Sequence, residues 1–155
     1  MYVAMYNDND HMALLVLDQS YMPDKSIKPI MIPLDENFTD NLCTWYMKHV
    51  GDDSNKIIMV TYDFSRVYDA IQDKLDCNYD LIFNRKFIDL FGIAHFITRR
   101  CKIVSEYSRV RSPHNLGMLF KAFDMYKQGD QRGDLIKNTW KIGQCYVKAL
   151  TMNLV

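Results

Sequence analysis

Short apolar runs separated by polar turns dominate the first third of the chain. Met1–Asn7 alternates aromatic and aliphatic residues, Met12–Leu17 is a continuous apolar run, and Ile27–Leu34 is an apolar stretch with two prolines. Runs of this length are typical of strands, and prolines favour a strand end or a sheet edge. The pattern predicts a three-stranded meander with turns at Asn7–Asp10 and Pro23–Ser26.

A helical period follows the meander, with Asn37 or Thr39 as its candidate N-cap. Its apolar residues recur at i, i+4, i+7, i+8 and i+11, through Phe38, Leu42, Trp45, Tyr46 and His49. Lys56–Tyr62 is a β-branched run bounded by polar residues, which predicts a strand. Asp63 or Ser65 then starts a second helix, whose apolar face carries Val67, Ala70, Ile71 and Leu75.

The rest of the chain combines one short strand pattern with helical periods. Tyr79–Phe83 predicts a fifth strand, Arg85–Arg100 a helix, and Lys102–Arg111 a basic irregular segment or helix extension. Ser112–Leu150 contains two amphipathic helices on either side of a polar connection. The order β-β-β-α-β-α-β-α-α-α predicts a single α/β domain over residues 1–155. Its mixed sheet has about five strands, with helices on its faces.

The net charge of zero conceals a separation of signs along the chain. Residues 1–84 carry six Lys/Arg against fourteen Asp/Glu, whereas residues 85–155 carry thirteen against five. Such a separation is typical of a polyanion-binding face beside an acidic, metal-binding face, or of two halves that neutralise each other. Seventeen of the nineteen acids are Asp, and Met and Tyr each number ten, which indicates an AT-rich genome such as that of a virus or phage.

Membrane and secretion signals are missing from the sequence pattern. The longest apolar runs, such as Met12–Leu17, are far shorter than the roughly 20 residues of a membrane span, and the N-terminus has no signal-peptide pattern. We therefore expect an intracellular, cytoplasmic protein with no membrane partner. The cysteines form no C-x-x-C pair, so we expect thiols in a reducing compartment at Cys43, Cys77, Cys101 and Cys145.

Two stretches in the second half carry a resemblance to a known family. Phe87–Ala94 reads Phe-Ile-Asp-Leu-Phe-Gly-Ile-Ala, Asn115–Leu119 reads Asn-Leu-Gly-Met-Leu, and a polar connection and an amphipathic helix follow. With the meander-helix-strand-helix order, the chain resembles the DEDD-type, proofreading-like 3′–5′ exonucleases of the RNase-H-like superfamily. The resemblance implies an RNase-H-like sheet and four carboxylates at the ends of its central strands, which hold two Mg²⁺ or Mn²⁺ ions.

Four aspartates are the candidate catalytic and metal-binding residues under this resemblance, namely Asp8, Asp10, Asp63 and Asp134. Each also has a structural interpretation. Asp8 and Asp10 fit a turn, and Asp63 fits a helix N-cap. Asp134 fits an acid that stabilises a helix N-terminus.

The chain departs from the family pattern at its acidic positions. Arg66 falls where the family has an acid after the fourth strand, and Asn138 falls where it has one in the last helix. Each replacement removes charge that two divalent cations require. We therefore expect a divergent, catalytically degraded member without a metal, acting as a nucleic-acid- or protein-binding accessory factor. The alternatives are an active Mg- or Mn-dependent exonuclease that uses the four aspartates, and a protein-interaction module without a nucleic-acid role.

The segment from Arg85 to Arg111 is rich in Arg and Lys and contains a tyrosine. It predicts contact with single-stranded nucleic acid, because Arg and Lys bind phosphates and aromatic rings stack on bases. A solvated helical face accounts for the same composition. The expected partners are single-stranded nucleic acid or a nucleic-acid-processing protein. The candidate contact residues are Arg85, Lys86, Arg99, Arg100, Lys102, Tyr107, Arg109 and Arg111.

Overall fold

Five strands and five helices make up the part of the chain that the computed structural model describes, which is residues 1–49, 57–74, 86–100, 116–125 and 134–155. The strands are β1 (Tyr2–Asn7), β2 (His11–Leu17), β3 (Ile30–Pro33), β4 (Ile58–Thr61) and β5 (Lys86–Asp89). The helices are α1 (Phe38–His49), α2 (Phe64–Ile71), α4 (Leu90–Arg100), α6 (Leu116–Ala122) and α7 (Leu135–Thr151).

One mixed sheet holds the strands in the order β3-β2-β1-β4-β5. The pairs β1–β2 and β2–β3 are antiparallel, so the first three strands form the expected meander. The pairs β1–β4 and β4–β5 are parallel; α1 precedes β4 in the chain, and α2 lies between β4 and β5. The predicted α/β fold class, with a mixed sheet of five strands that begins with a meander and is flanked by helices, is therefore confirmed.

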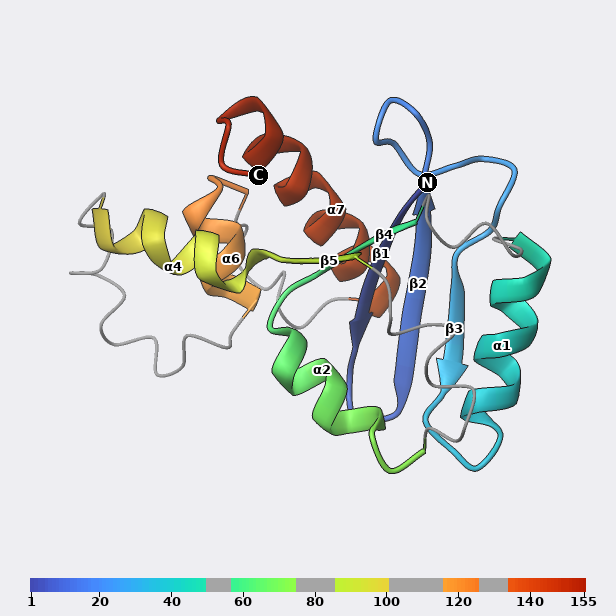
Figure 1. Ribbon diagram of the computed structural model, residues 1–155. Coiled ribbons are helices and arrows are strands. Elements are labelled where there is room, and N and C mark those ends of the chain that lie inside the picture. The colour runs from blue at the N-terminus through green and yellow to red at the C-terminus, as the bar shows by residue number, and fades with distance from the viewer. Residues whose placement is uncertain (50–56, 75–85, 101–115, 126–133) are drawn as a thin grey trace.

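The helices are distributed around both faces and both edges of the sheet (Figure 1). α1 runs beside the edge strand β3, while α4 and α6 lie together near the β5 edge and α6 contacts α7. The β1–β2 turn, the start of α1 and the end of α2 meet at the end of the sheet that lies away from the N-terminus (Figure 1). This end is where the candidate functional site is found.

The apolar stretches predicted as the first two strands form β1 and β2, and both of their faces are covered. Val3 and Met5 point into the main core, which also receives the predicted α1 residues Phe38 and Leu42. On the other face, Ala4, Leu15 and Leu17 form a smaller cluster with Ile136 and Trp140 of α7. A strand that is buried on both faces reads as a continuous apolar run instead of an alternating one.

A glycine allows α7 to approach the sheet closely. A Cβ atom at Gly143 would lie 3.3 Å from Leu17 Cδ1 and 3.7 Å from the Ala4 Cβ. Gly92 in α4 is different, because it is exposed and a Cβ atom there would meet nothing within 4 Å. The two glycines therefore have opposite consequences for packing.

Two lysines of α7 tie this helix to the end of α6. Lys141 Nζ donates to the Met125 carbonyl at 3.0 Å, and Lys148 Nζ donates to the Phe123 carbonyl at 2.7 Å. Lys141 is only 8% exposed, and its ammonium also lies 4.9 Å from the centre of the Phe120 ring. Cations stabilise the negative C-terminal end of a helix. Part of the positive charge in the second half of the chain is therefore used inside the fold.

The prediction of one helix over Arg85–Arg100 is wrong in its first turn. Lys86–Asp89 forms the strand β5, and the helix α4 begins at Leu90. Phe87 and Ile88 suit a helix or a strand equally, and pairing with Met59 and Val60 of β4 decides in favour of the strand. The strand predicted at Tyr79–Phe83 and the segment Lys102–Arg111 lie outside the described residues.

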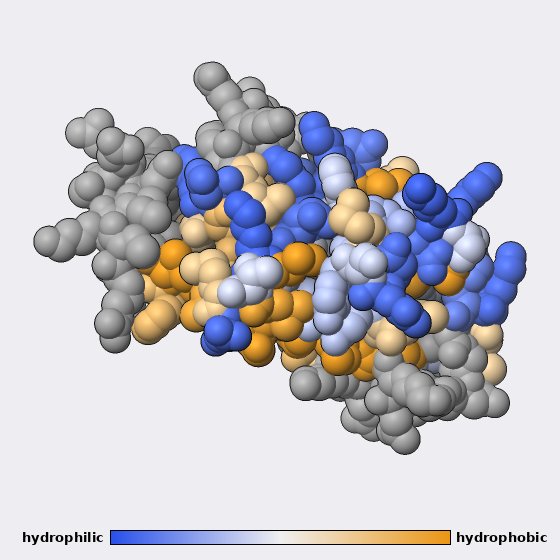
Figure 2. Space-filling view, turned by 90° about the horizontal axis from the view of Figure 1, so that it is seen from above, coloured by the Kyte–Doolittle hydropathy of each residue, from blue (hydrophilic) through white to orange (hydrophobic). Residues whose placement is uncertain are grey.

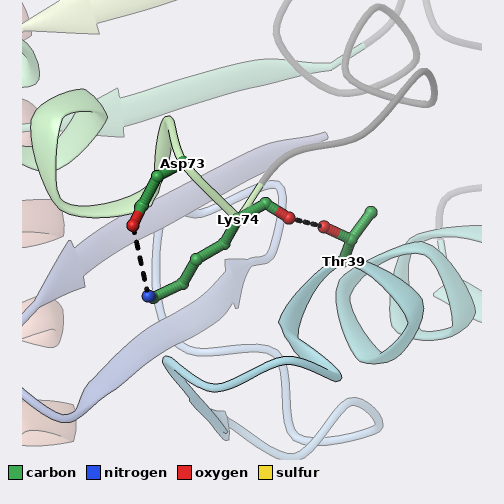
Figure 3. Close-up of polar contacts among 3 residues, drawn as sticks. All are labelled: Thr39, Asp73 and Lys74. Carbon is green, nitrogen blue, oxygen red and sulfur yellow. Dashed lines mark hydrogen bonds and ion pairs between the residues drawn. The ribbon is translucent and has the colours of Figure 1, made fainter.

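The start of α1 also differs in detail from the expected capping. Thr39, one of its two candidate caps, lies inside the helix, and its hydroxyl donates to the carbonyl of Lys74 after α2 (Figure 3). The other candidate, Asn37, directly precedes the helix, and its carbonyl accepts from Asn41 N. The Thr39 contact connects α1 to the turn that follows α2.

The end of the molecule that carries both termini mixes hydrophobic and hydrophilic residues (Figure 2). Met1, Met22 and Met152 are among the exposed large hydrophobic residues. Across the ranges described by the structure, none of the helices has the length and apolar character needed to cross a membrane.

We expect opposite effects from adding side chains at the two glycines. Gly143→Leu forces α7 away from Ala4 and Leu17 and should lower the free energy of unfolding by about 1–3 kcal/mol. Gly92→Ala should raise it by about 0.5–1 kcal/mol, because alanine favours a helix and the site has room. Urea unfolding followed by circular dichroism measures both changes. Equal effects at the two positions would contradict the packing described here.

Cys145 should resist alkylation in the folded protein. Burial raises the pKa of its thiol to about 12, and only the thiolate reacts. Iodoacetamide at mildly alkaline pH, followed by peptide mass spectrometry, should modify Cys145 at least about tenfold more slowly in the folded chain than in guanidinium. Equal rates in the two states would mean that this face of α7 opens readily.

Cys43 and Cys145 both carry thiols and not disulfides, as expected, whereas Cys77 and Cys101 lie outside the described ranges.

Candidate functional site

Polar side chains gather where the three parallel strands end. β1 ends at Asn7 and β5 ends at Asp89. β4 ends at Thr61, and Asp63 lies two residues further along the chain. Asn7, Thr61 and Asp63 are at most 3% exposed, although the surrounding core is apolar. Ligands of open α/β sheets bind outside the carboxyl ends of parallel strands, so this edge is the candidate functional site.

The Asp89 carboxylate organises the edge by accepting three backbone hydrogen bonds. Oδ1 accepts from Asp63 N at 2.8 Å and from Phe91 N at 3.0 Å, and Oδ2 accepts from Phe64 N at 2.9 Å. The first turns of α2 and α4 both contain backbone N–H groups that lack partners within their helices. One carboxylate therefore satisfies amide groups at the start of both helices.

Asp63 makes the sharp turn between β4 and α2. Its φ of 59° and ψ of 64° lie in the left-handed region, which aspartate tolerates better than most residues. Its side chain accepts from Arg66 N at 3.4 Å and so caps α2, while its own N–H is held by Asp89. The predicted N-cap role of Asp63 is confirmed.

The turn directs Arg66 towards the end of β1. Arg66 Nη2 donates to the Asn7 carbonyl at 3.0 Å and lies 3.5 Å from Asn7 Oδ1. The guanidinium carbon also lies 4.5 Å from the centre of the Tyr6 ring, which is a cation–π contact. Burial raises the pKa of the Tyr6 phenol, and the charge of Arg66 partly opposes that shift. A fixed positive charge therefore lies at the end of the central strand.

Two of the other candidate aspartates, Asp8 and Asp134, accept hydrogen bonds from backbone N–H groups. Asp8 Oδ1 accepts from Asp10 N at 2.8 Å and from His11 N at 2.7 Å, which fixes the β1–β2 turn, and Asp10 is exposed in that turn. Asp134 caps α7 by accepting from Ile136 N at 2.8 Å. The turn and cap interpretations of these residues are therefore confirmed.

The four candidate aspartates do not form one group. Within the described ranges, no three His, Cys, Asp or Glu side chains are gathered so that they could hold a metal ion. Asp63 lies at the end of the parallel strands, Asp8 and Asp10 lie in the hairpin turn, and Asp134 lies at the start of α7. Asn138, which aligns with the family's last acid, is buried in α7 and 5% exposed.

The predicted nucleic-acid-binding segment is largely outside the described part of the chain. Lys86 lies in β5 and Arg99 and Arg100 end α4, but the structure describes only their backbone. The residues that fall outside the described ranges altogether are Arg85, Lys102, Tyr107, Arg109 and Arg111.

Two residues of the site were not assigned a role from the sequence. The helical period over Arg85–Arg100 places Asp89 within a helix, although an acid between an apolar pair and a helical period is also a pattern for a strand end followed by an N-cap. The sequence predicts Asn7 only as the last residue of a strand and the first residue of a turn. Its burial follows from the central place of β1 in the sheet, which no local pattern reports.

Comparison with known proteins identifies no relative, because no protein-family model, curated protein or solved structure matches this chain. The geometry at the carboxyl ends of the strands is therefore the basis for a functional proposal.

Removing the Asp89 carboxylate should destabilise the whole edge. Asp89→Ala leaves three backbone N–H groups without their acceptor, and we expect a loss of about 2–4 kcal/mol in the free energy of unfolding. Asp89→Asn keeps one acceptor oxygen and should lose less. Urea unfolding measures both, with the exposed Asp69→Ala of α2 as a control that should stay within about 0.5 kcal/mol of the parent. An Asp89→Ala protein as stable as this control would rule out the proposed capping.

Proposed function

We propose that this chain is an RNase-H-like domain that binds nucleic acid without cleaving it. Its main support is the Arg66 guanidinium at the end of the central strand, where it donates to the Asn7 carbonyl and packs over the Tyr6 ring. A two-metal nuclease requires several carboxylates at this point, because they neutralise two divalent cations and position the attacking water. A fixed cation in the same place repels metal ions and attracts phosphate instead.

The nearby acids support the same proposal. Asp89 uses both of its oxygens to accept backbone N–H groups, and Asp63 uses Oδ1 to cap α2. Each of these carboxylates therefore has fewer lone pairs left for a metal ion. A metal ion bound here would share their oxygens with the backbone N–H groups that stabilise the turn between β4 and α2.

Affinity for nucleic acid is expected from the distribution of basic residues. Residues 85–155 carry thirteen Lys/Arg against five Asp/Glu, and two of those lysines, Lys141 and Lys148, serve to hold α6 and α7 together. The other cations of this half, together with Arg66, are the candidates for phosphate contact. Phosphate contacts supply most of the sequence-independent affinity of nucleic-acid-binding proteins.

The proposal predicts binding without hydrolysis. Fluorescence anisotropy with short labelled single-stranded DNA and RNA should give a dissociation constant that rises steeply between about 50 and 200 mM salt, because bound counterions are released. The labelled strands should remain intact after incubation with Mg²⁺ or Mn²⁺, as judged on denaturing gels.

Cleavage is the outcome that would overturn this proposal. Metal-dependent degradation that copurifies with the protein and disappears in Asp63→Asn would identify an active nuclease. Intact strands that also fail to bind at low salt would favour the protein-interaction module. The Asp69→Asn protein is the matched control, because this exposed aspartate lies on the same helix and away from the strand ends.

A further inference from the structure

A cavity of about 450 Å³ lies beside Arg66, at the end of the sheet where the β1–β2 turn meets α2. Its polar walls come from the turn and from α2, and Leu34 closes it on the side of β3. The lining residues are Asn7, Asp8, Asn9, Leu34, Arg66, Ala70 and Lys74.

Both cations of this cavity come from α2 and the turn that follows it. Arg66 and Ala70 lie four residues apart, on one side of α2, and Lys74 lies in the turn after the helix ends at Ile71. The small side chain of Ala70 leaves room for a ligand. All three residues line the cavity, which thus receives a guanidinium and an ammonium.

The backbone of Lys74 is held, whereas the partner that its ammonium has among the described residues is weak. The Thr39 hydroxyl donates to the Lys74 carbonyl, and Lys74 Nζ lies 3.8 Å from Asp73 Oδ2 (Figure 3). Asp73 is 73% exposed, and ion pairs at such exposure contribute little. The ammonium can therefore turn to a ligand at small cost, whereas the chain that carries it stays in place.

Hydrogen-bonding capacity also remains on Arg66. Both hydrogen bonds from the Arg66 guanidinium to Asn7 come from Nη2, and Arg66 Nε is buried without a hydrogen-bond partner among the described residues. The acid in the lining, Asp8, already accepts two backbone N–H groups through Oδ1. Two cations and one hydrogen-bonded carboxylate leave the cavity with an excess of donors.

We infer that this cavity binds a phosphate group of single-stranded nucleic acid, with Arg66 and Lys74 as its two cationic contacts. The inference rests on the proposed function, which it makes specific by naming the contact site. A guanidinium whose Nε–H lacks a partner among the described residues and a weakly paired ammonium match the oxygens of a phosphate, which accept charge-assisted hydrogen bonds. The two side chains supply the positive charge that divalent cations supply to phosphate in a nuclease.

Lys74→Gln tests the inference without removing the backbone contact to Thr39. At about 0.1 M salt, the loss of one phosphate contact should weaken binding of labelled single-stranded DNA about fivefold and reduce the slope of log K against log salt by about 0.7. Lys28→Gln, which changes an exposed lysine between β2 and β3, should leave both quantities unchanged. Urea unfolding of Lys74→Gln confirms that the comparison is made between equally stable proteins.

A second measurement reports on Arg66 directly. The side-chain Nε–H signal of Arg66, assigned by its absence in Arg66→Lys, should shift on addition of inorganic phosphate, and the shift should be smaller in Lys74→Gln. If DNA binds the parent and Lys74→Gln equally, the inference is wrong and the proposed function stands. If DNA does not bind but phosphate shifts the Arg66 signal, the proposed function fails and the anion site stands. If phosphate leaves the signal unchanged, the anion site is refuted.

Discussion

The Asp89 carboxylate is the constraint on which the carboxyl edge of the sheet depends. Parallel pairing of β4 and β5 brings the starts of α2 and α4 to the same edge of the sheet. The first backbone N–H groups of a helix have no carbonyl within that helix to which they can donate. Asp89 accepts hydrogen bonds from the backbone N–H groups of Asp63, Phe64 and Phe91, and so provides an acceptor at the start of both helices. It also stabilises the left-handed conformation of Asp63, which sets the direction of α2 and places Arg66 at the end of β1.

The acids of this edge therefore serve the backbone, and the charge that faces the end of β1 is positive. A positive side chain can take the place of metal-binding acids here, because a phosphodiester is bound either by metal ions held on carboxylates or directly by guanidinium and ammonium groups. The first arrangement activates water and leads to hydrolysis. The second neutralises phosphate without supplying a nucleophile, and this difference is the reason for proposing binding without cleavage.

The separation of charge along the chain gives an incomplete account of where positive charge acts. In the basic half, Lys141 and Lys148 are used to hold α7 against the end of α6. The two cations that share a cavity, Arg66 and Lys74, come from the acidic half. Charge summed over a segment reports composition, whereas a ligand meets only those groups that the fold brings to one surface.

Local patterns alone determined the meander, the helix α1, the strand β4 and the capping roles of Asp63 and Asp134, because each depends on residues a few positions apart. Tertiary structure decided the rest. Lys86–Asp89 is a strand because β4 offers it a partner, although its sequence also suits a helix. Asn7 and Arg66, 59 residues apart, meet only because the strand order places β4 beside β1. The candidate site depends on that strand order, which no short stretch of sequence contains.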